Sequence, residues 1–339
     1  MKKIFYGILY CAIILTSSCK KAETTPTATS GTGKSHKDLK GLSVVNGVII
    51  FSDLSTYQAT VQTLDANQQS ATAAFNATLP ANATSDQVQA AATKQGYNEN
   101  QPFLDFENSL SFHSMRMDFE TAVLAWAANG LDDADPANPF TYYTSGNYAF
   151  LSTLNPSGAV GIGTELWKVM RNGVVYEITD GDFNTLGNIT DANMDKAYTA
   201  SNVVIHNPDM LGQHVKYLGG SCQHNKVTSN NFGPGAPHLQ VFIEVHDYAF
   251  VNFKRTQDIN WNKKGGSWYR DWALIDPKFG EDGDCDHFFN DCGGFVWVTY
   301  KTCTSYYRGT GQSGNLRATP VVVGGAWGSS QSAFTLVLQ

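Results

Sequence analysis

The pattern of apolar and polar residues near the start of the chain predicts a strand followed by a helix. Residues 42–51 are mostly Val, Ile, Leu and Phe around Asn46-Gly47, a pattern typical of a strand with a turn or bulge. Ser52 or Asp53 can then cap a helix, because a short polar side chain accepts hydrogen bonds from the first free N–H groups. The helix itself is predicted by apolar residues that recur at intervals of three and four: Leu54, Tyr57, Val61 and Leu64.

A second helix is predicted further along the chain. Its apolar face consists of Met115, Phe119, Val123 and Trp126, and Asn129-Gly130 ends it. The stretch between the two helices, residues 66–95, is rich in Ala, Thr, Asn and Gln. This low complexity predicts a solvated insertion with a short helix after Ser85.

The middle of the chain contains a strong hairpin signal. Residues 160–170 and 174–178 are rich in apolar side chains and flank Arg171-Asn172-Gly173. Asn-Gly readily adopts the positive φ angles of a type I′ turn, so we expect a hairpin with that turn. Residues 180–235 are rich in Asn and Gly, and a short strand is predicted at 203–205.

From His238 onward the pattern is that of β-strands. Leu239, Val241, Ile243 and Val245 alternate with Gln240, Phe242, Glu244 and His246, and Tyr248, Phe250 and Phe253 extend the pattern. The Gly-containing residues 263–266 predict a turn into 267–275, and strand-like segments follow at 295–307, 317–323 and 333–338. Short strands between Gly-rich turns are typical of an antiparallel sandwich.

We therefore expect an α+β fold in which an N-terminal α+β module is followed by an all-β, antiparallel, sandwich-like domain. The predicted segments are a signal peptide at 1–18, a flexible tether at 19–41, the α+β module at 42–200, a linker at 201–237 and the β domain at 238–339. A mature chain of about 320 residues is long for one hydrophobic core and comfortable for two.

The first residues have the layout of an export signal. Lys2 and Lys3 are followed by an apolar run over 4–15 and by small residues before Cys19. Twelve apolar residues rise about 18 Å as a helix, less than the roughly 30 Å hydrocarbon core of a bilayer. We therefore expect the leader to be removed rather than retained as a membrane span.

Cys19 after Thr16-Ser17-Ser18 resembles the lipobox of bacterial lipoproteins, in the loose form found in Bacteroidetes. The resemblance implies a diacylglycerol on Cys19 and a membrane attachment through that lipid. Ordinary cleavage that leaves a free Cys19 is the alternative. Lys20 follows in place of the aspartate that retains lipoproteins in the inner membrane, so the outer membrane is expected, with the periplasmic or surface face left open.

A second segment carries a similar resemblance. Residues 154–163 read Leu-Asn-Pro-Ser-Gly-Ala-Val-Gly-Ile-Gly and residues 166–169 read Leu-Trp-Lys-Val. This part of 148–178 is similar to a recurrent segment of uncharacterised bacteroidete lipoproteins. With the strand and helix of residues 44–64, it looks like their N-terminal module, and no activity comes with the resemblance.

Charge and cysteine content limit the possible partners and the compartment. The formal net charge of −7 becomes −9 when Lys2 and Lys3 are removed with the leader, which argues against nucleic acid as a partner. Four cysteines remain besides Cys19, and in an exported chain they predict two disulfides: Cys222, Cys285, Cys292 and Cys303. Pairing of Cys285 with Cys292 and of Cys222 with Cys303 is one of three possibilities, and a zinc site with His224 and His287 is an alternative.

Residues 276–291 form the most acidic loop of the chain. Asp282, Asp284 and Asp286 alternate as in a calcium loop, although His287 and Gly293 stand where such a loop needs its glycine and its bidentate glutamate. A solvated acidic loop without a cofactor is the simpler interpretation, and carboxylates that hydrolyse a glycosidic bond are a further one.

Aromatic residues of the C-terminal half offer a possible glycan-binding platform, because flat rings stack on sugars. The candidates are Trp261, Trp268, Tyr269 and Trp272, and we expect Trp261 and Trp268 to be exposed if they bind a glycan. Core packing explains these aromatics equally well.

These observations favour a lipid-anchored cell-envelope protein with a non-catalytic binding or scaffolding role. The partner would be a glycan or another envelope protein. The alternatives are a carbohydrate-binding surface lipoprotein that uses the C-terminal aromatics, and an exported hydrolase that uses the loop 276–291. The sequence shows no GxSxG motif and no phosphate-binding glycine loop.

Overall fold

The structure is a computed structural model. It describes residues 41–131, 138–143, 145–193, 197–206, 208, 226–231, 238–276, 278–281, 290–291, 295–306, 316–318, 321–323, 332–333 and 336–338. All of them belong to one compact unit, residues 35–339. The fold is α+β with a sheet-rich C-terminal region, as predicted.

A six-stranded sheet begins with the predicted N-terminal strand. β1 (Leu42–Val45) and β2 (Val48–Phe51) form a hairpin, and its two turn residues Asn46 and Gly47 have φ of 50° and 74°. Positive φ at both positions is the type I′ geometry, so the predicted turn is confirmed. The sheet continues with β3 (Ala159–Ile162), β4 (Glu165–Val169), β5 (Val175–Ile178) and β6 (Val203–His206) in sequence order. β2 and β3 are parallel and the other neighbours are antiparallel.

The hairpin between β4 and β5 is confirmed, but its predicted turn type is wrong. The N–H of Met170 donates to Val174 O (2.8 Å) and the N–H of Gly173 donates to Met170 O (2.9 Å). Gly173 has φ of 88°, whereas Asn172 does not have positive φ. The connection is therefore a type I turn followed by a left-handed glycine, because three residues rather than two, 171–173, separate the hydrogen-bonded pair Met170 and Val174.

The first helix is longer than its apolar stripe predicts. α1 (Leu54–Asn76) begins at the N-cap Asp53, whose side chain accepts from the N–H of Thr56, and it buries Tyr57, Val61 and Leu64. Leu54 is 43% exposed, so its predicted place in the stripe is wrong.

Most of the insertion predicted at 66–95 is exposed, as expected, but its first part is not separate from the first helix. α1 continues through residue 76 and buries Phe75 against Val88 and Ala92 of α2 (Ser85–Gln95). The short helix predicted after Ser85 is confirmed as α2, and a capping box between Thr84 and Gln87 begins it.

The remaining helices lie in different parts of the fold. α4 (Met115–Ala128) buries all four residues of its predicted stripe and ends at Asn129, as predicted. The others are α3 (Gln101–Ser109), α5 (Pro139–Tyr142), α6 (Tyr148–Leu151), α7 (Phe183–Asn188) and a 3-10 turn (Asp191–Asn193).

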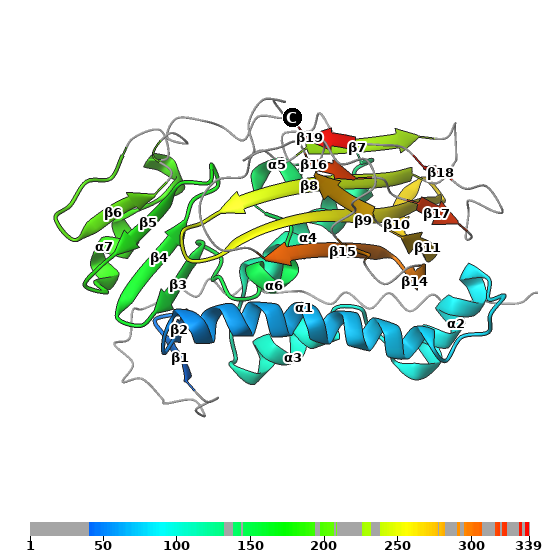
Figure 1. Ribbon diagram of the computed structural model, residues 1–339, viewed down its shortest axis with the longest axis horizontal. Coiled ribbons are helices and arrows are strands. Elements are labelled where there is room, and N and C mark those ends of the chain that lie inside the picture. The colour runs from blue at the N-terminus through cyan, green and yellow to red at the C-terminus, as the bar shows by residue number, and fades with distance from the viewer. Residues whose placement is uncertain are drawn as a thin grey trace, which may run out of the picture. The chain divides into compact units, whose positions relative to one another are not determined.

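The C-terminal region consists of three antiparallel sheets (Figure 1). The largest contains β7 (Lys226–Asn231), β8 (His238–Asp247), β9 (Asn252–Lys264), β10 (Ser267–Arg270) and β15 (Tyr300–Tyr306). The second contains β14 (Val296–Val298), β11 (Ala273–Asp276), β17 (Val321–Val323) and β18 (Ser332–Ala333). The third contains β13 (Asn290–Asp291), β12 (Lys278–Glu281), β16 (Leu316–Ala318) and β19 (Leu336–Leu338).

The strand predicted from His238 through Phe253 is two strands. Ala249, with φ of 65°, lies in the turn between β8 and β9, and Phe250 N–H donates to Tyr248 O at 2.7 Å. The Gly265-Gly266 turn between β9 and β10 is as predicted.

One hydrophobic core joins the helices to both the six-stranded sheet and the β8–β9 sheet. It contains Phe51, Tyr57, Phe119, Phe150 and Trp261, among others. Phe253, Ile259 and Trp261 lie on one face of β9 and pack into this core. The predicted boundary at 201–237 lies mostly outside the described residues and stays a prediction.

Candidate binding groove beside helix α1

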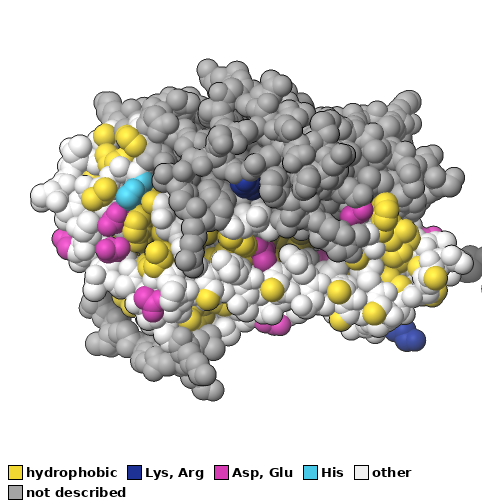
Figure 2. All heavy atoms as spheres, viewed as in Figure 1, with side chains coloured by type: hydrophobic (Ala, Val, Ile, Leu, Met, Phe, Trp, Pro, Cys, Tyr) yellow, Lys and Arg dark blue, Asp and Glu magenta, His cyan; other side chains and the backbone are white. Residues whose placement is uncertain are grey.

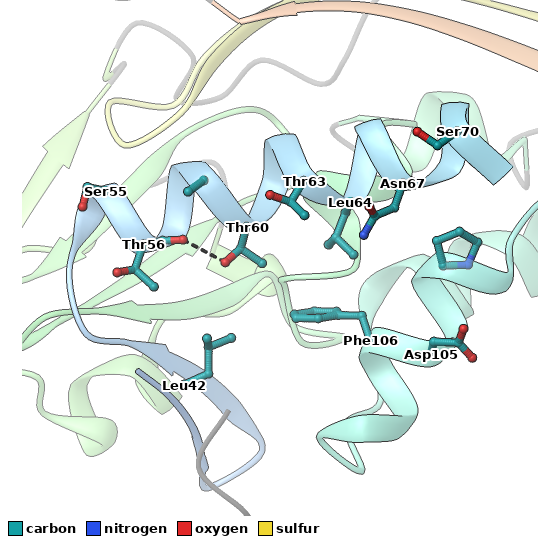
Figure 3. Close-up of a pocket in the computed structure, with 12 residues that line it drawn as sticks. Leu42, Ser55, Thr56, Thr60, Thr63, Leu64, Asn67, Ser70, Asp105 and Phe106 are labelled. Carbon is teal, nitrogen blue, oxygen red and sulfur yellow. Dashed lines mark hydrogen bonds between the residues drawn. The ribbon is translucent and has the colours of Figure 1, made fainter. Parts of the chain in front are cut away.

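A groove of about 820 Å³ lies between α1 and α3 (Figure 3). Its α1 wall is lined by small side chains: Ser55, Thr56, Ala59, Thr60, Thr63, Asn67 and Ser70. Pro102, Asp105 and Phe106 of α3 form the other wall, and Leu42 of β1 closes one end. The groove is therefore built from β1 and α1, which are close in sequence, and from α3, which follows α2.

The spacing of α1 explains why this face is small and polar. Positions 56, 60, 63, 67 and 70 recur at intervals of three and four, so they share a helix face beside the buried stripe of Tyr57, Val61 and Leu64. Because their side chains are short, the neighbouring α3 does not fill the space above them.

The N-terminal end of the groove is organised by Asp53. Its carboxylate accepts hydrogen bonds from Thr56 N–H (2.7 Å), Ser55 Oγ (2.7 Å), Ser52 Oγ (2.8 Å) and Thr56 Oγ1 (3.0 Å). These bonds, that of the Thr56 backbone foremost, hold the pKa of Asp53 well below its usual value. Thr60 Oγ1 donates to Thr56 O at 2.8 Å, which is the dashed line of Figure 3.

The chemistry of the groove is that of a neutral, hydrogen-bonding surface. Thr63, Asn67 and Ser70 offer hydroxyl and amide groups, and Phe106 adds one aromatic ring. Asp105 is the charged residue of the lining, and its Oδ1 already accepts from Gln101 Nε2 at 2.7 Å. Figure 2 shows the same surface of α1 as mostly uncharged side chains and backbone.

Behind α1, the β8–β9 sheet carries a buried ion pair. The Glu244 carboxylate accepts from Arg255 Nε (2.7 Å) and Nη2 (2.8 Å), and also from Ser145 Oγ (3.0 Å) and Gly146 N–H (3.1 Å). Burial opposes the ionisation of Glu244, but Arg255 outweighs it and holds the Glu244 pKa well below its usual value. The pair joins β8 and β9 to the segment before α6.

A second buried network surrounds Arg270 of β10. Its guanidinium donates to Glu120 of α4 (2.8 and 3.1 Å) and to Tyr148 Oη (2.9 Å), and Tyr148 in turn donates to Glu120. The Arg270 Cζ lies 5.7 Å from the Trp261 ring centre and 5.4 Å from that of Tyr300. Cation–π contact and the bidentate carboxylate together balance the desolvated charge.

Two carboxyls connect the helical region to β15 and to Thr299 just before it. Tyr306 Oη donates to Asp65 of α1, and burial raises the Asp65 pKa to about 6. Glu99 accepts from Thr299 N–H (2.7 Å) and Oγ1 (2.5 Å), and burial raises its pKa to about 7. These groups are structural links, since each is closed in by its partner.

The four aromatic residues of the predicted glycan-binding platform differ in exposure and do not form one exposed surface. Trp261 is 0% exposed and Trp272 is 6% exposed, so the expectation that Trp261 is exposed is wrong. Trp261 is buried because its ring packs on Trp126 and its Nε1 donates to Gln240 (3.1 Å). Trp268 is half-buried below Lys263, and Tyr269 is exposed.

The remaining predicted site residues are mostly outside the described part of the chain. These are Cys19, Cys222, Cys285, Cys292, Asp282, Asp284 and Asp286. Cys303 is buried in β15, and its pairing stays a prediction. Among the described residues, no group of three or more His, Cys, Asp or Glu side chains could hold a metal, and no helix could span a membrane.

Comparison with known proteins adds little. No family model matches the chain. No curated protein matches it. Among solved structures the chain is similar to a DUF4848 family protein from Bacteroides thetaiotaomicron, with 14% sequence identity and a TM-score of 0.21 over 88% of this chain and 100% of that one. At this TM-score the likeness carries neither fold nor function over to this chain.

Proposed function

We propose that this protein is a lipid-anchored cell-envelope protein with a non-catalytic binding role, and that the α1–α3 groove is its binding surface. The observation that carries the proposal is the lining of this groove, an uncharged α1 wall of mostly short hydrogen-bonding side chains beside the partly buried ring of Phe106. Such a lining binds a neutral polar ligand through many weak contacts, since each net hydrogen bond contributes about 1 kcal/mol. It offers no buried nucleophile or paired acid and base.

The anchor follows from the N-terminal sequence. The apolar leader and the lipobox-like Cys19 support acylation, and Lys20 supports the outer membrane. Several acyl chains on one residue anchor stably, because each buried CH₂ contributes roughly 0.8 kcal/mol.

A glycan is the ligand class that the groove supports best. Sugar hydroxyls donate and accept, as do Thr63, Asn67 and Ser70, and a pyranose face can stack on Phe106. We therefore propose the α1–α3 groove, rather than the C-terminal aromatic residues, as the carbohydrate-binding site. Another envelope protein is the second candidate ligand, and hydrolysis by the loop 276–291 is a separate proposal.

Two experiments test the anchor and the groove. Radiolabelled palmitate should be incorporated into the wild-type protein and not into Cys19→Ala. Equal labelling of both proteins would refute the proposed lipid anchor on Cys19. A glycan array with the full-length protein in detergent should give specific binding that is lost in Thr63→Phe, which fills the groove. Gln62→Phe, an exposed neighbour outside the groove, is the control.

The array result separates the candidates. If Thr63→Phe leaves glycan binding unchanged, the glycan binds outside the groove. If no plant, host or microbial glycan on the array binds, another envelope protein is the remaining candidate ligand. For the hydrolase proposal, any turnover found should be abolished by Asp284→Asn.

A further inference from the structure

A second groove, of about 550 Å³, lies on the other flank of α1, along β15. Ala66, Gln69, Ser70 and Ala73 line its helix side, and residues 300–304 line its strand side. Figure 1 shows α1 running alongside β15 at this point.

β15 is an edge strand among the strands that the structure describes. It pairs with β9 over residues 300–306, and its other side has no described strand partner. Thr299 O accepts from the N–H of Asn260 of β9 at 3.0 Å. Because backbone groups alternate in direction along an antiparallel strand, Tyr300, Thr302 and Thr304 direct their N–H and C=O groups away from β9.

The strand just before β15, β14 of the β11 sheet, has its free backbone groups occupied by a side chain of α1. Asn76 of α1 donates from Nδ2 to Trp297 O (3.0 Å) and accepts at Oδ1 from Trp297 N–H (2.6 Å). A primary amide thereby makes both bonds that a neighbouring strand would make. Glu99 accepts the N–H of Thr299, which lies in the bend between β14 and β15. From Tyr300 onward, α1 faces the groove with alanine, serine, threonine and glutamine side chains instead.

We propose that the outer edge of β15 binds an extended, uncharged peptide segment of a partner protein as an added strand in the groove between β15 and α1. Residues 300–304 span roughly 13 Å, so a partner segment of about five residues can pair with them. The backbone groups supply the affinity, as strand addition requires.

The shape of the groove favours a single extended chain over a second copy of this protein. α1 forms the opposite wall, so the folded sheet of another copy would collide with α1 before reaching β15. The unpartnered Thr304 Oγ1, which lines the groove and is shielded from solvent, provides one further hydrogen-bonding group for the segment.

Charge favours a neutral segment. Residues 66–85 contain no Asp, Glu, Lys or Arg, so the helix wall is uncharged. Lys301 is only 8% exposed and lies opposite Asp258 in the strand register. A charged side chain in the groove would lose hydration without finding an exposed counter-charge there.

The test uses the full-length protein in detergent and a capped, dye-labelled peptide, acetyl-Thr-Val-Thr-Val-Thr-amide. Fluorescence anisotropy should show saturable binding. N-methylation of alternate peptide nitrogens should weaken it about tenfold or more, since it removes the N–H groups that pair with β15. A peptide with Lys in place of Val should bind more weakly than the original peptide, to a similar extent.

Matched variants locate the site. Ala73→Trp fills the groove and should weaken binding about tenfold, whereas Ala74→Trp, exposed on the same helix but outside the lining, should not. Absence of binding, or equal binding of the N-methylated peptide, would overturn the proposal. So would a concentration-dependent dimer that Ala73→Trp disrupts, because the occupant would then be a second copy. The peptide comparison decides the matter even if Ala73→Trp fails to fold.

Discussion

Replacing Glu244 by glutamine removes the charge that balances a fully buried arginine. Arg255 is 0% exposed and Glu244 is 2% exposed, and two hydrogen bonds of 2.7 and 2.8 Å join them. Glutamine keeps the size of the side chain but places one amide group against the donors of Arg255, Ser145 and Gly146. The variant therefore leaves a buried cation without its counter-charge.

The expected loss is about 3–5 kcal/mol of the free energy of unfolding, the range found when one member of a buried ion pair is removed. Replacing both residues, as Glu244→Gln with Arg255→Met, should cost less than Glu244→Gln alone because no uncompensated charge remains. Glu177→Gln is the control: its carboxylate is 2.8 Å from His206 Nε2, both side chains are partly exposed, and the expected loss is about 0–1 kcal/mol.

Urea unfolding of the full-length protein, followed by tryptophan fluorescence at pH 7, measures these differences. A loss below about 1 kcal/mol for Glu244→Gln would refute the reasoning, because it would mean that the Arg255 charge is solvated in the folded state. The wild type should also lose stability as the pH falls below the ordinary glutamate pKa, since the folded-state pKa of Glu244 is lowered.

Three further predictions follow from single residues. Burial raises the Glu99 pKa to about 7, so the folded state keeps a proton that the unfolded state loses, and stability should fall by up to roughly 3 kcal/mol between pH 4.5 and 7. Glu99→Gln should flatten this part of the stability profile. Gly158→Ala should destabilise the protein by about 1–3 kcal/mol, because φ is +83° and a Cβ would lie 2.2 Å from Val169 O; Gly187→Ala, in open space on α7, should not. Trp126→Ala should cost about 3–5 kcal/mol in urea unfolding, since its ring is buried.

Local sequence signals predicted turns and helix starts well. The turn lies at Asn46-Gly47, the first helix starts after Asp53, and the helix α4 ends at Asn129, all as the residue types predict. The turn type at Asn172-Gly173 was not predictable from the dipeptide alone, because the number of residues between the strands selects the turn and the strand ends depend on pairing across the sheet. The extent of α1 was missed for a related reason. Thr72 and Phe75 are buried on the same helix face as Tyr57, Val61 and Leu64. Because Thr72 is polar, the apolar pattern in the sequence ends at Leu64.

The burial of polar strand residues was not predicted from the sequence. Gln240 and Glu244 alternate with Leu239 and Val241, and all four are buried. Both faces of β8 are covered, and besides Arg255, its cross-strand neighbour, Glu244 is bonded by residues far away in sequence, Ser145 and Gly146. No local pattern identifies such partners, because they meet only when the helices pack on the sheet. The α1–α3 groove was missed likewise, since it depends on α3 lying beside the short side chains of α1.

These polar links explain why α1 can offer a groove on each flank. Gln58 donates to Phe250 O (3.0 Å), Asp65 accepts from Tyr306, and Asn76 binds both backbone groups of Trp297, so α1 is held at its start, middle and end. Breaking any of these bonds would leave a shielded polar group unpaired, which costs about 1–3 kcal/mol. The position of the helix is thus fixed by directional bonds on one side. Its other faces need not pack tightly to hold it in place, and short side chains there leave the space that both proposed binding sites occupy.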